Sequence, residues 1–175
     1  MKLKNFLLVC LLISTNAVTS YANTPEQTRP FEDSYIEIGY KTLGEALDDF
    51  KQHFGEGLVL PLRVPPVEFT HYFGRFNDLE GELNDSFEVE FINEHMGKNH
   101  YMINVKHIDC KLNIPAKYVI NSFKLKDGSE AKYLEFESFN GLIFEKGNWQ
   151  YFLSHPSSIS DKITAEILVE IANTI

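Results

Sequence analysis

The sequence predicts an α+β domain, in which a curved antiparallel sheet forms as a meander of hairpins with an N-terminal helix and a C-terminal helix packed on it. Closely spaced turn signals separate runs rich in aromatic and β-branched residues, which is typical of consecutive antiparallel strands. Segments with helical periodicity precede and follow these runs. A sheet with one apolar face must be covered, so we expect the two helices to pack on this face. The sheet is expected to contain about six to eight strands.

The first helix is expected to begin at Thr42 and to end at Gly55. Thr42 and Glu45 make a Thr-x-x-Glu capping box, and glycine suits the left-handed residue that ends many helices. The apolar residues between these ends recur on one face and are Leu43, Ala46, Leu47, Phe50 and Phe54.

The closing helix is expected to follow Ser160, which can cap it, and Asp161 favours its positive end. Its apolar stripe consists of Ile163, Ile167, Leu168 and Ile171. Such a stripe must be buried, and the sheet is the natural partner.

Between the helices, residues 58–62 are expected to form a short strand, and residues 67–76 a longer one. The prolines at 61, 65 and 66 can lie only at a sheet edge or outside the ladder.

Further along, three dipeptides signal tight turns, and these are Asp127-Gly128, Asn140-Gly141 and Gly147-Asn148. If the last one is a two-residue turn, Phe144 faces Tyr151 and Leu142 faces Leu153 across the hairpin. Apolar side chains then meet apolar ones, as cross-strand pairs in a sheet prefer.

A histidine-rich stretch, HMGKNHYMINVKHIDC at residues 95–110, is expected to belong to a hairpin that turns around Gly97-Lys98-Asn99. In that register Phe91 pairs with Val105 and Val89 with His107, while Glu90 pairs with Lys106 on the other face.

This register separates His95, His100 and His107 too widely for one zinc ion. His107 and Asp109 share a face, and His71 could supply a third ligand from another strand. A metal-assisted hydrolase built on His71, His107 and Asp109 is therefore the alternative function. Cys110 is expected to be a small buried hydrophobe, because the nearby Asp109 disfavours a reactive thiolate.

The acidic segment at residues 78–90 fails the EF-hand pattern. Counted from Asp78, the pattern requires glycine at the sixth position and glutamate at the twelfth, where the chain has Leu83 and Val89. We expect a solvated acidic loop and leave a looser calcium site open.

The N-terminus predicts export. Lys2 and Lys4 precede an apolar run too short to span a bilayer, and small residues mark a cleavage site after Ala22. We therefore expect a signal peptide at 1–22, a flexible leader at 23–39, a single domain at 40–175, and a secreted or extracytoplasmic location without a transmembrane segment in the mature chain.

Charge excludes some partners. The formal net charge is −9, and loss of the two lysines with the signal peptide makes it −11. A strongly acidic surface repels phosphate polymers, so nucleic acid is not an expected partner.

The order of elements resembles an uncharacterised extracytoplasmic domain family of Gram-positive bacteria, found in secreted proteins and in membrane-anchored anti-sigma-type regulators. The segments that carry the resemblance are the first helix, LVLPLRVPP, NWQYFLSH and ITAEILVEIANTI. The resemblance implies a non-enzymatic envelope domain without catalytic residues, with a curved sheet like that of lipoprotein carriers.

We therefore predict an exported binding or sensing module that presents a sheet face or edge to a protein, peptide or apolar ligand, without catalytic residues, metal or cofactor. Aromatic residues in excess of one core are expected to border the ligand site, and these are Phe69, Phe73, Phe136, Phe144, Tyr151 and Phe152.

Overall fold

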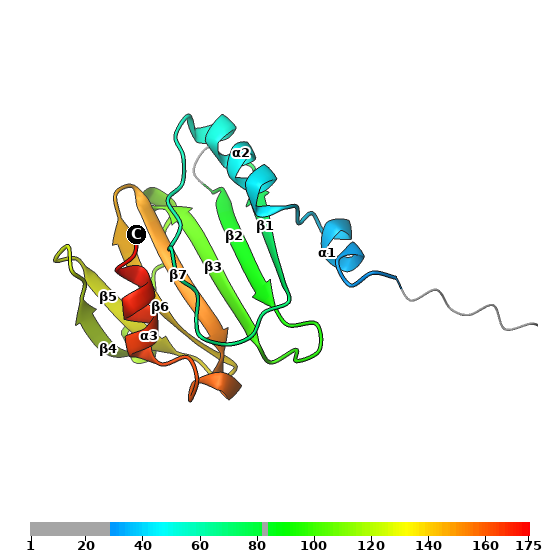
Figure 1. Ribbon diagram of the computed structural model, residues 1–175. Helices are drawn as coiled ribbons and strands as arrows, with labels where there is room; N and C mark the ends of the chain where they lie inside the picture. Colours follow the sequence, from blue (N-terminus) through cyan, green and yellow to red (C-terminus); the bar gives the residue numbers. More distant parts are fainter. Residues whose placement is uncertain (1–28, 82–83) are drawn as a thin grey trace, which may run out of the picture.

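The computed structural model describes residues 29–81 and 84–175 (Figure 1). The predicted signal peptide at 1–22 and residues 23–28 of the predicted leader lie outside the described residues. Within the described chain, seven strands form one open antiparallel sheet, which confirms the predicted fold class. The strands are β1 (His71–Asn77), β2 (Ser86–Ile92), β3 (His100–His107), β4 (Val119–Lys124), β5 (Glu130–Glu135), β6 (Phe139–Lys146) and β7 (Trp149–Pro156).

The strand order β1-β2-β3-β7-β6-β5-β4 joins two meanders. Strands β1 to β3 form the first and strands β4 to β7 the second, and β7 pairs with β3 at the junction. The chain therefore leaves β3 and runs through residues 108–118 to the far edge, where β4 begins. The sequence predicted a meander, in which strands that follow one another in the chain are also neighbours in the sheet. The structure departs from this at one step, because β3 pairs with β7 and not with β4.

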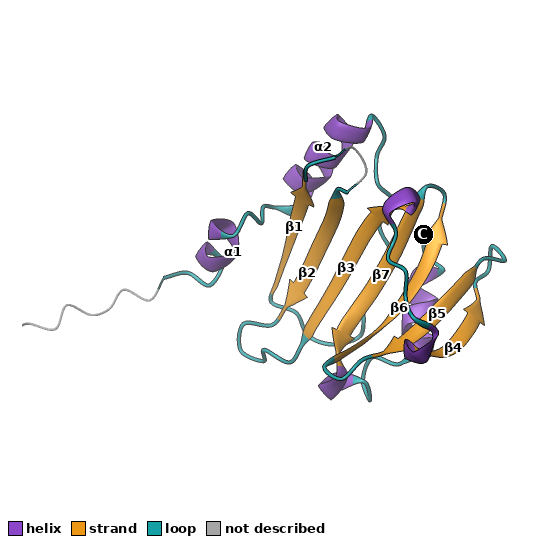
Figure 2. Ribbon diagram, turned by 180° about the vertical axis from the view of Figure 1, so that it is seen from behind, coloured by secondary structure: helices purple, strands orange, loops and turns teal. Residues whose placement is uncertain are grey.

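The two faces of the sheet differ in what covers them. We call the first the core face, and α2 (Leu43–Phe54), the connection at 55–70 and α3 (Ala165–Ala172) lie over it (Figure 1). The hydroxyl of Tyr151, which points to this face, donates to the Val59 carbonyl at 2.9 Å. The opposite face, which we call the outer face, is crossed by residues 108–118 (Figure 2).

Helix α2 begins and ends as predicted. Thr42 and Glu45 form the complete capping box, and Gly55 ends the helix in the left-handed conformation with φ 73°. Ala46 and Phe50 are buried against β1 and β2. The helix comes so close to β1 that a Cβ on Gly74 would lie 2.8 Å from the Cβ of Ala46.

Two predicted features of the chain's middle are wrong. Residues 58–62 pair with no strand, because this segment crosses the core face, where Leu58 and Leu60 pack on the core. Asn140-Gly141 is not a turn and lies inside β6. A Cβ at Gly141 would meet the Phe152 ring at 2.6 Å, so this glycine permits close packing in the sheet.

The predicted turn at Asp127-Gly128 connects β4 and β5, and Gly128 has the positive φ of 90° that favours glycine. The Gly147-Asn148 turn connects β6 and β7 in the predicted register, with Phe144 opposite Tyr151 and Leu142 opposite Leu153.

The predicted register of the β2–β3 hairpin is wrong. Phe91 lies opposite Tyr101 instead of Val105, and Val89 lies opposite Ile103 instead of His107. The strands end at Ile92 and His100, which leaves a loop at 93–99 in place of the three-residue turn.

The physical reason is Asn93, which is buried and ends β2. Its side-chain oxygen accepts from the N–H groups of His95 and Met96 at 2.9 Å, and its own N–H donates to the Asn99 carbonyl. This local turn outcompetes continued strand pairing. Because the register differs by an even number of residues, each side chain keeps its predicted face.

The closing helix starts later than predicted. Its N-cap is Thr164, whose side chain accepts from the Ile167 N–H. Ser160 instead follows the short 3-10 helix Ser157–Ile159. Its hydroxyl accepts a hydrogen bond from the side-chain amide of the buried Asn140 at 2.8 Å. Leu168 and Ile171 are buried on the sheet, as the apolar stripe predicted.

The described part of the predicted leader packs on the sheet. It contains a short helix, α1 (Asp33–Glu37), and the Tyr35 ring stacks on Phe73 with centroids 4.7 Å apart. Phe31 joins the same small cluster beside Tyr40 and Ile92.

The contact between α2 and β1 gives a stability test. Gly74→Ala should lower the free energy of unfolding by about 1 to 3 kcal/mol, because the new methyl group forces the helix away from the strand. Gly44→Ala is the matched control, since nothing lies within 4 Å of its Cβ position, and it should be neutral or stabilising. Urea unfolding of both variants measures the difference, and equal stabilities would contradict the packing argument.

Candidate binding surface on the outer face

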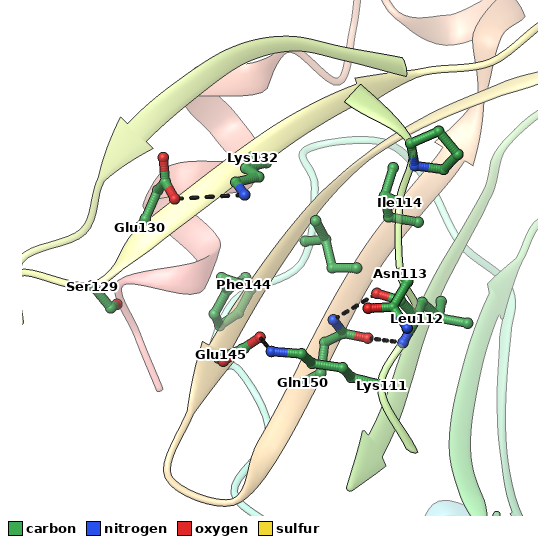
Figure 3. A pocket seen from close by; sticks show the side chains of 12 residues that line it. Lys111, Leu112, Asn113, Ile114, Ser129, Glu130, Lys132, Phe144, Glu145 and Gln150 are labelled. Atoms are coloured by element: carbon green, nitrogen blue, oxygen red, sulfur yellow. Dashed lines mark hydrogen bonds and ion pairs between the residues drawn. The ribbon is translucent and has the colours of Figure 1, made fainter. Parts of the chain in front are cut away.

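The outer face carries a cleft between β5–β6–β7 and the crossing segment at 111–115 (Figure 3). Its volume is about 620 Å³, which falls in the usual range for ligand sites. The residues that line it come from the crossing segment (Lys111, Leu112, Asn113, Ile114, Pro115), from β5 and its turn (Ser129, Glu130, Lys132), and from β6 and β7 (Ile143, Phe144, Glu145, Gln150).

Gln150 holds the crossing segment in place. Its side-chain oxygen accepts from the Leu112 N–H at 2.7 Å, and its side-chain nitrogen donates to the Leu112 carbonyl at 3.2 Å. Both bonds are visible in Figure 3. Gln150 is itself buried, so the pair of bonds is shielded from water and fixes the wall of the cleft on the sheet.

The cleft rim bears charges of both signs. Lys111 and Glu145 form an ion pair at 2.7 Å, and Lys132 lies 3.7 Å from Glu130 (Figure 3). All four side chains are substantially exposed, so these ion pairs add little to stability. They remain available to exchange partners with a charged ligand.

The wall also offers main-chain groups. The N–H groups of Asn113 and Ile114 donate to no other group within the described part of the chain. Extended backbone with unpaired N–H groups is the feature that bound peptides use when they add to a protein's main chain.

A second, smaller groove of about 330 Å³ lies further along the outer face. Phe152, Phe139 and Met102 supply most of its apolar character, and Pro156 closes one side. Phe139 stacks on Phe136 with centroids 4.4 Å apart, which extends the apolar area toward Tyr118. The other residues that line it are His100, Ser138, Ser154 and His155.

A network of polar groups occupies the outer face of β1 to β3, beside this groove. The Tyr40 hydroxyl donates to Glu90 at 2.6 Å, and Arg75 pairs with Glu88 at 2.6 Å. Nε2 of His100 lies 3.6 Å from Glu90. Burial raises the pKa of Glu90, but the contacts with His100 and Tyr40 and the charge of Arg75 outweigh it and hold that pKa below its ordinary value.

The six aromatic residues predicted to border a ligand site do not meet in one cavity. Phe152 lines the smaller groove, and Phe136 packs beside it. Phe144 borders the cleft but is only 2% exposed, and it stacks on Tyr151 inside the core. Phe69 packs against Phe91 and Tyr101, and Phe73 lies under Tyr35.

The residues of the alternative hydrolase are not brought together. His71 begins β1 and His107 ends β3, so they lie at opposite ends of the sheet. Nδ1 of His107 is 3.4 Å from Asp109, and no third ligand-type side chain joins this pair in the described chain. Cys110 is partly exposed, so the prediction that it is buried is wrong, and it forms no disulfide within the described residues.

Sequence reasoning missed the cleft. Its wall lies in LNIP, residues 112–115, where broken alternation and a proline were the available signals. They indicate a connection that is not a strand, but they do not reveal which strands it crosses. That depends on β7 pairing with β3.

Comparisons with protein-family models, with curated proteins and with solved structures found no match to this chain. In the part of the chain that the structure describes, none of the helices has the length and apolar character needed to cross a membrane.

The polar network predicts acid sensitivity. Because the folded-state pKa of Glu90 is lowered, its contribution to stability is complete above the unfolded value of about 4.3 and is lost as the pH falls through the folded value. Glu90→Gln should be less stable than wild type by about 1 to 3 kcal/mol near neutral pH. The difference should be smaller at about pH 3, because protonation of Glu90 is favoured as the pH falls below the unfolded value.

Urea unfolding at both pH values measures this difference, with Glu137→Gln, a change at an exposed glutamate, as the control. A stability gap for Glu90→Gln that is the same at both pH values would contradict the lowered pKa.

Proposed function

We propose that this protein is a non-enzymatic exported binding module of the cell envelope, which holds an extended peptide segment of a partner protein in the cleft on the outer face. The observation that carries the proposal is the cleft itself, whose wall is fixed on the sheet by both hydrogen bonds of Gln150. A preformed site binds without the cost of ordering itself.

The chemistry of the cleft favours a peptide over an acyl chain. Its rim carries two lysines and two glutamates, whereas Ile143, Ile114 and Pro115 supply a short apolar surface. The rim charges pair with one another and give an acyl chain no apolar surface to contact, while a peptide can exchange partners with them and fill the apolar part with one side chain. The N–H groups of Asn113 and Ile114 can pair with its carbonyl groups.

The net charge of the chain favours a positively charged peptide. With a formal net charge of −9, the protein attracts positive segments and repels acidic ones. We therefore expect the bound segment to be extended and basic, with an apolar residue between polar neighbours.

A phage-displayed library of short random peptides, panned on the protein, tests the proposal. Enriched peptides should be basic overall and should bind saturably. Their affinity should fall about tenfold or more for Glu130→Lys, because a positive charge at the rim of the cleft repels a basic peptide. The control is Glu94→Lys, which makes the same charge change at an exposed position of the 93–99 loop, away from the cleft.

Equal losses for both variants would mean that peptides respond only to net charge, and the cleft proposal would then be wrong. The smaller groove supports a second candidate, an apolar ligand, because Phe139, Phe152 and Met102 face it. Saturable binding of a fluorescent acyl probe that Phe152→Lys abolishes and Glu130→Lys leaves unchanged would favour that candidate.

A further inference from the structure

Three metal-ligand side chains meet at the turn end of the β1–β2 hairpin, and the proposed cleft uses none of them. They are His53, Asp78 and Asp85, and their candidate ligand atoms all lie within 4.8 Å of one another. Asp78 and Asp85 belong to the acidic segment that fails the EF-hand pattern. His53 belongs to helix α2.

The fold brings the three residues together. Asn77 at the end of β1 pairs with Ser86 at the start of β2. Asp78 and Asp85 are therefore the first and last residues of the loop that joins these two strands. His53 lies in the last turn of α2, which packs on β1 and β2. Strand pairing and helix packing therefore both position the group.

Asp85 is the decisive residue. Its side chain is 1% exposed, and Oδ1 accepts from the Leu79 N–H at 2.7 Å. Oδ2 lies 2.9 Å from Nε2 of His53, but this buried oxygen accepts no hydrogen bond among the described residues. A buried carboxylate oxygen without a hydrogen-bond donor is strongly unfavourable, and a cation bound beside the two atoms would be a partner for both.

The histidine ring is held in place. Phe54 packs against it edge-on with centroids 4.7 Å apart, and Phe76 lies at 5.1 Å. Two ligand atoms of one ion, each at about 2.0 to 2.2 Å, are themselves about 3 to 3.5 Å apart. The Asp85–His53 separation of 2.9 Å is slightly shorter than this range, so the two side chains would move apart a little to admit an ion. A ligand atom of the exposed Asp78 lies within 4.8 Å of both.

We propose that His53, Asp78 and Asp85 bind one divalent transition metal ion, with solvent in the remaining coordination positions. Imidazole nitrogen favours zinc and its neighbours in the first transition row over calcium, and two carboxylates neutralise the ion's charge. The bound ion joins the end of α2 to the β1–β2 hairpin. This site is independent of the peptide cleft, which lies on the opposite face of the sheet.

Calorimetric titration of the full chain with ZnCl₂, after removal of metals with a chelator, tests the site. Wild type should bind one zinc ion, and Asp78→Asn should bind about tenfold more weakly or not at all, because a neutral amide replaces a ligand. Asp109→Asn is the control. It removes the carboxylate of the other close histidine–aspartate pair, at 3.4 Å from His107, and should leave zinc affinity unchanged.

Thermal melting supplies a second measurement. Zinc should raise the melting temperature of wild type and of Asp109→Asn, but not that of Asp78→Asn. Asp78 is exposed, so its variant should melt normally without metal. If it does not, His53→Gln replaces it and should show the same loss of zinc affinity. The assignment would be overturned by absent saturable zinc binding, by binding that Asp109→Asn weakens as much as Asp78→Asn, or by binding of CaCl₂ in place of zinc.

Discussion

The pairing of β3 with β7 is the interaction on which the rest of the structure depends. Six consecutive residue pairs, from Met102 opposite Ser154 to His107 opposite Trp149, join the two meanders into one sheet. Without it, each meander would expose an unpaired edge and half of an apolar face. With it, Val105, Tyr151 and Phe144 lie side by side across the junction and share one core.

The same pairing produces the outer-face cleft. Since β7 takes the place beside β3, the chain must carry β4 to the opposite edge, and residues 108–118 cross the outer face to reach it. Successive side chains of β7 point to opposite faces of the sheet and so stabilise both. Tyr151 points into the core and donates to Val59, while Gln150 points outward and fixes Leu112.

Two glycines show how closely the layers approach. Gly74 lets α2 lie on β1, and Gly141 lets the Phe152 ring lie on β6. Neither has the positive φ that marks turn glycines such as Gly55 and Gly128. In the sequence, Asn140-Gly141 has the composition of a turn, and only the neighbouring strand reveals that the glycine makes room for a ring. Similarly, the buried Asn93 ends β2 through bonds that the alternation of apolar residues does not encode.

The sequence by itself determined the features that depend on near neighbours in the chain. These include the fold class, the capping box and stop of α2, the turns at Asp127-Gly128 and Gly147-Asn148, and the faces on which the predicted pairs of the β2–β3 and β6–β7 hairpins lie. Each follows from local periodicity or backbone conformation, which a few adjacent residues decide. The tertiary structure alone decided the strand order, the route of residues 108–118, and the meeting of His53 with Asp78 and Asp85. These depend on contacts between residues far apart in the chain. Such contacts stabilise the protein only after β3 and β7 have paired and brought the two meanders together.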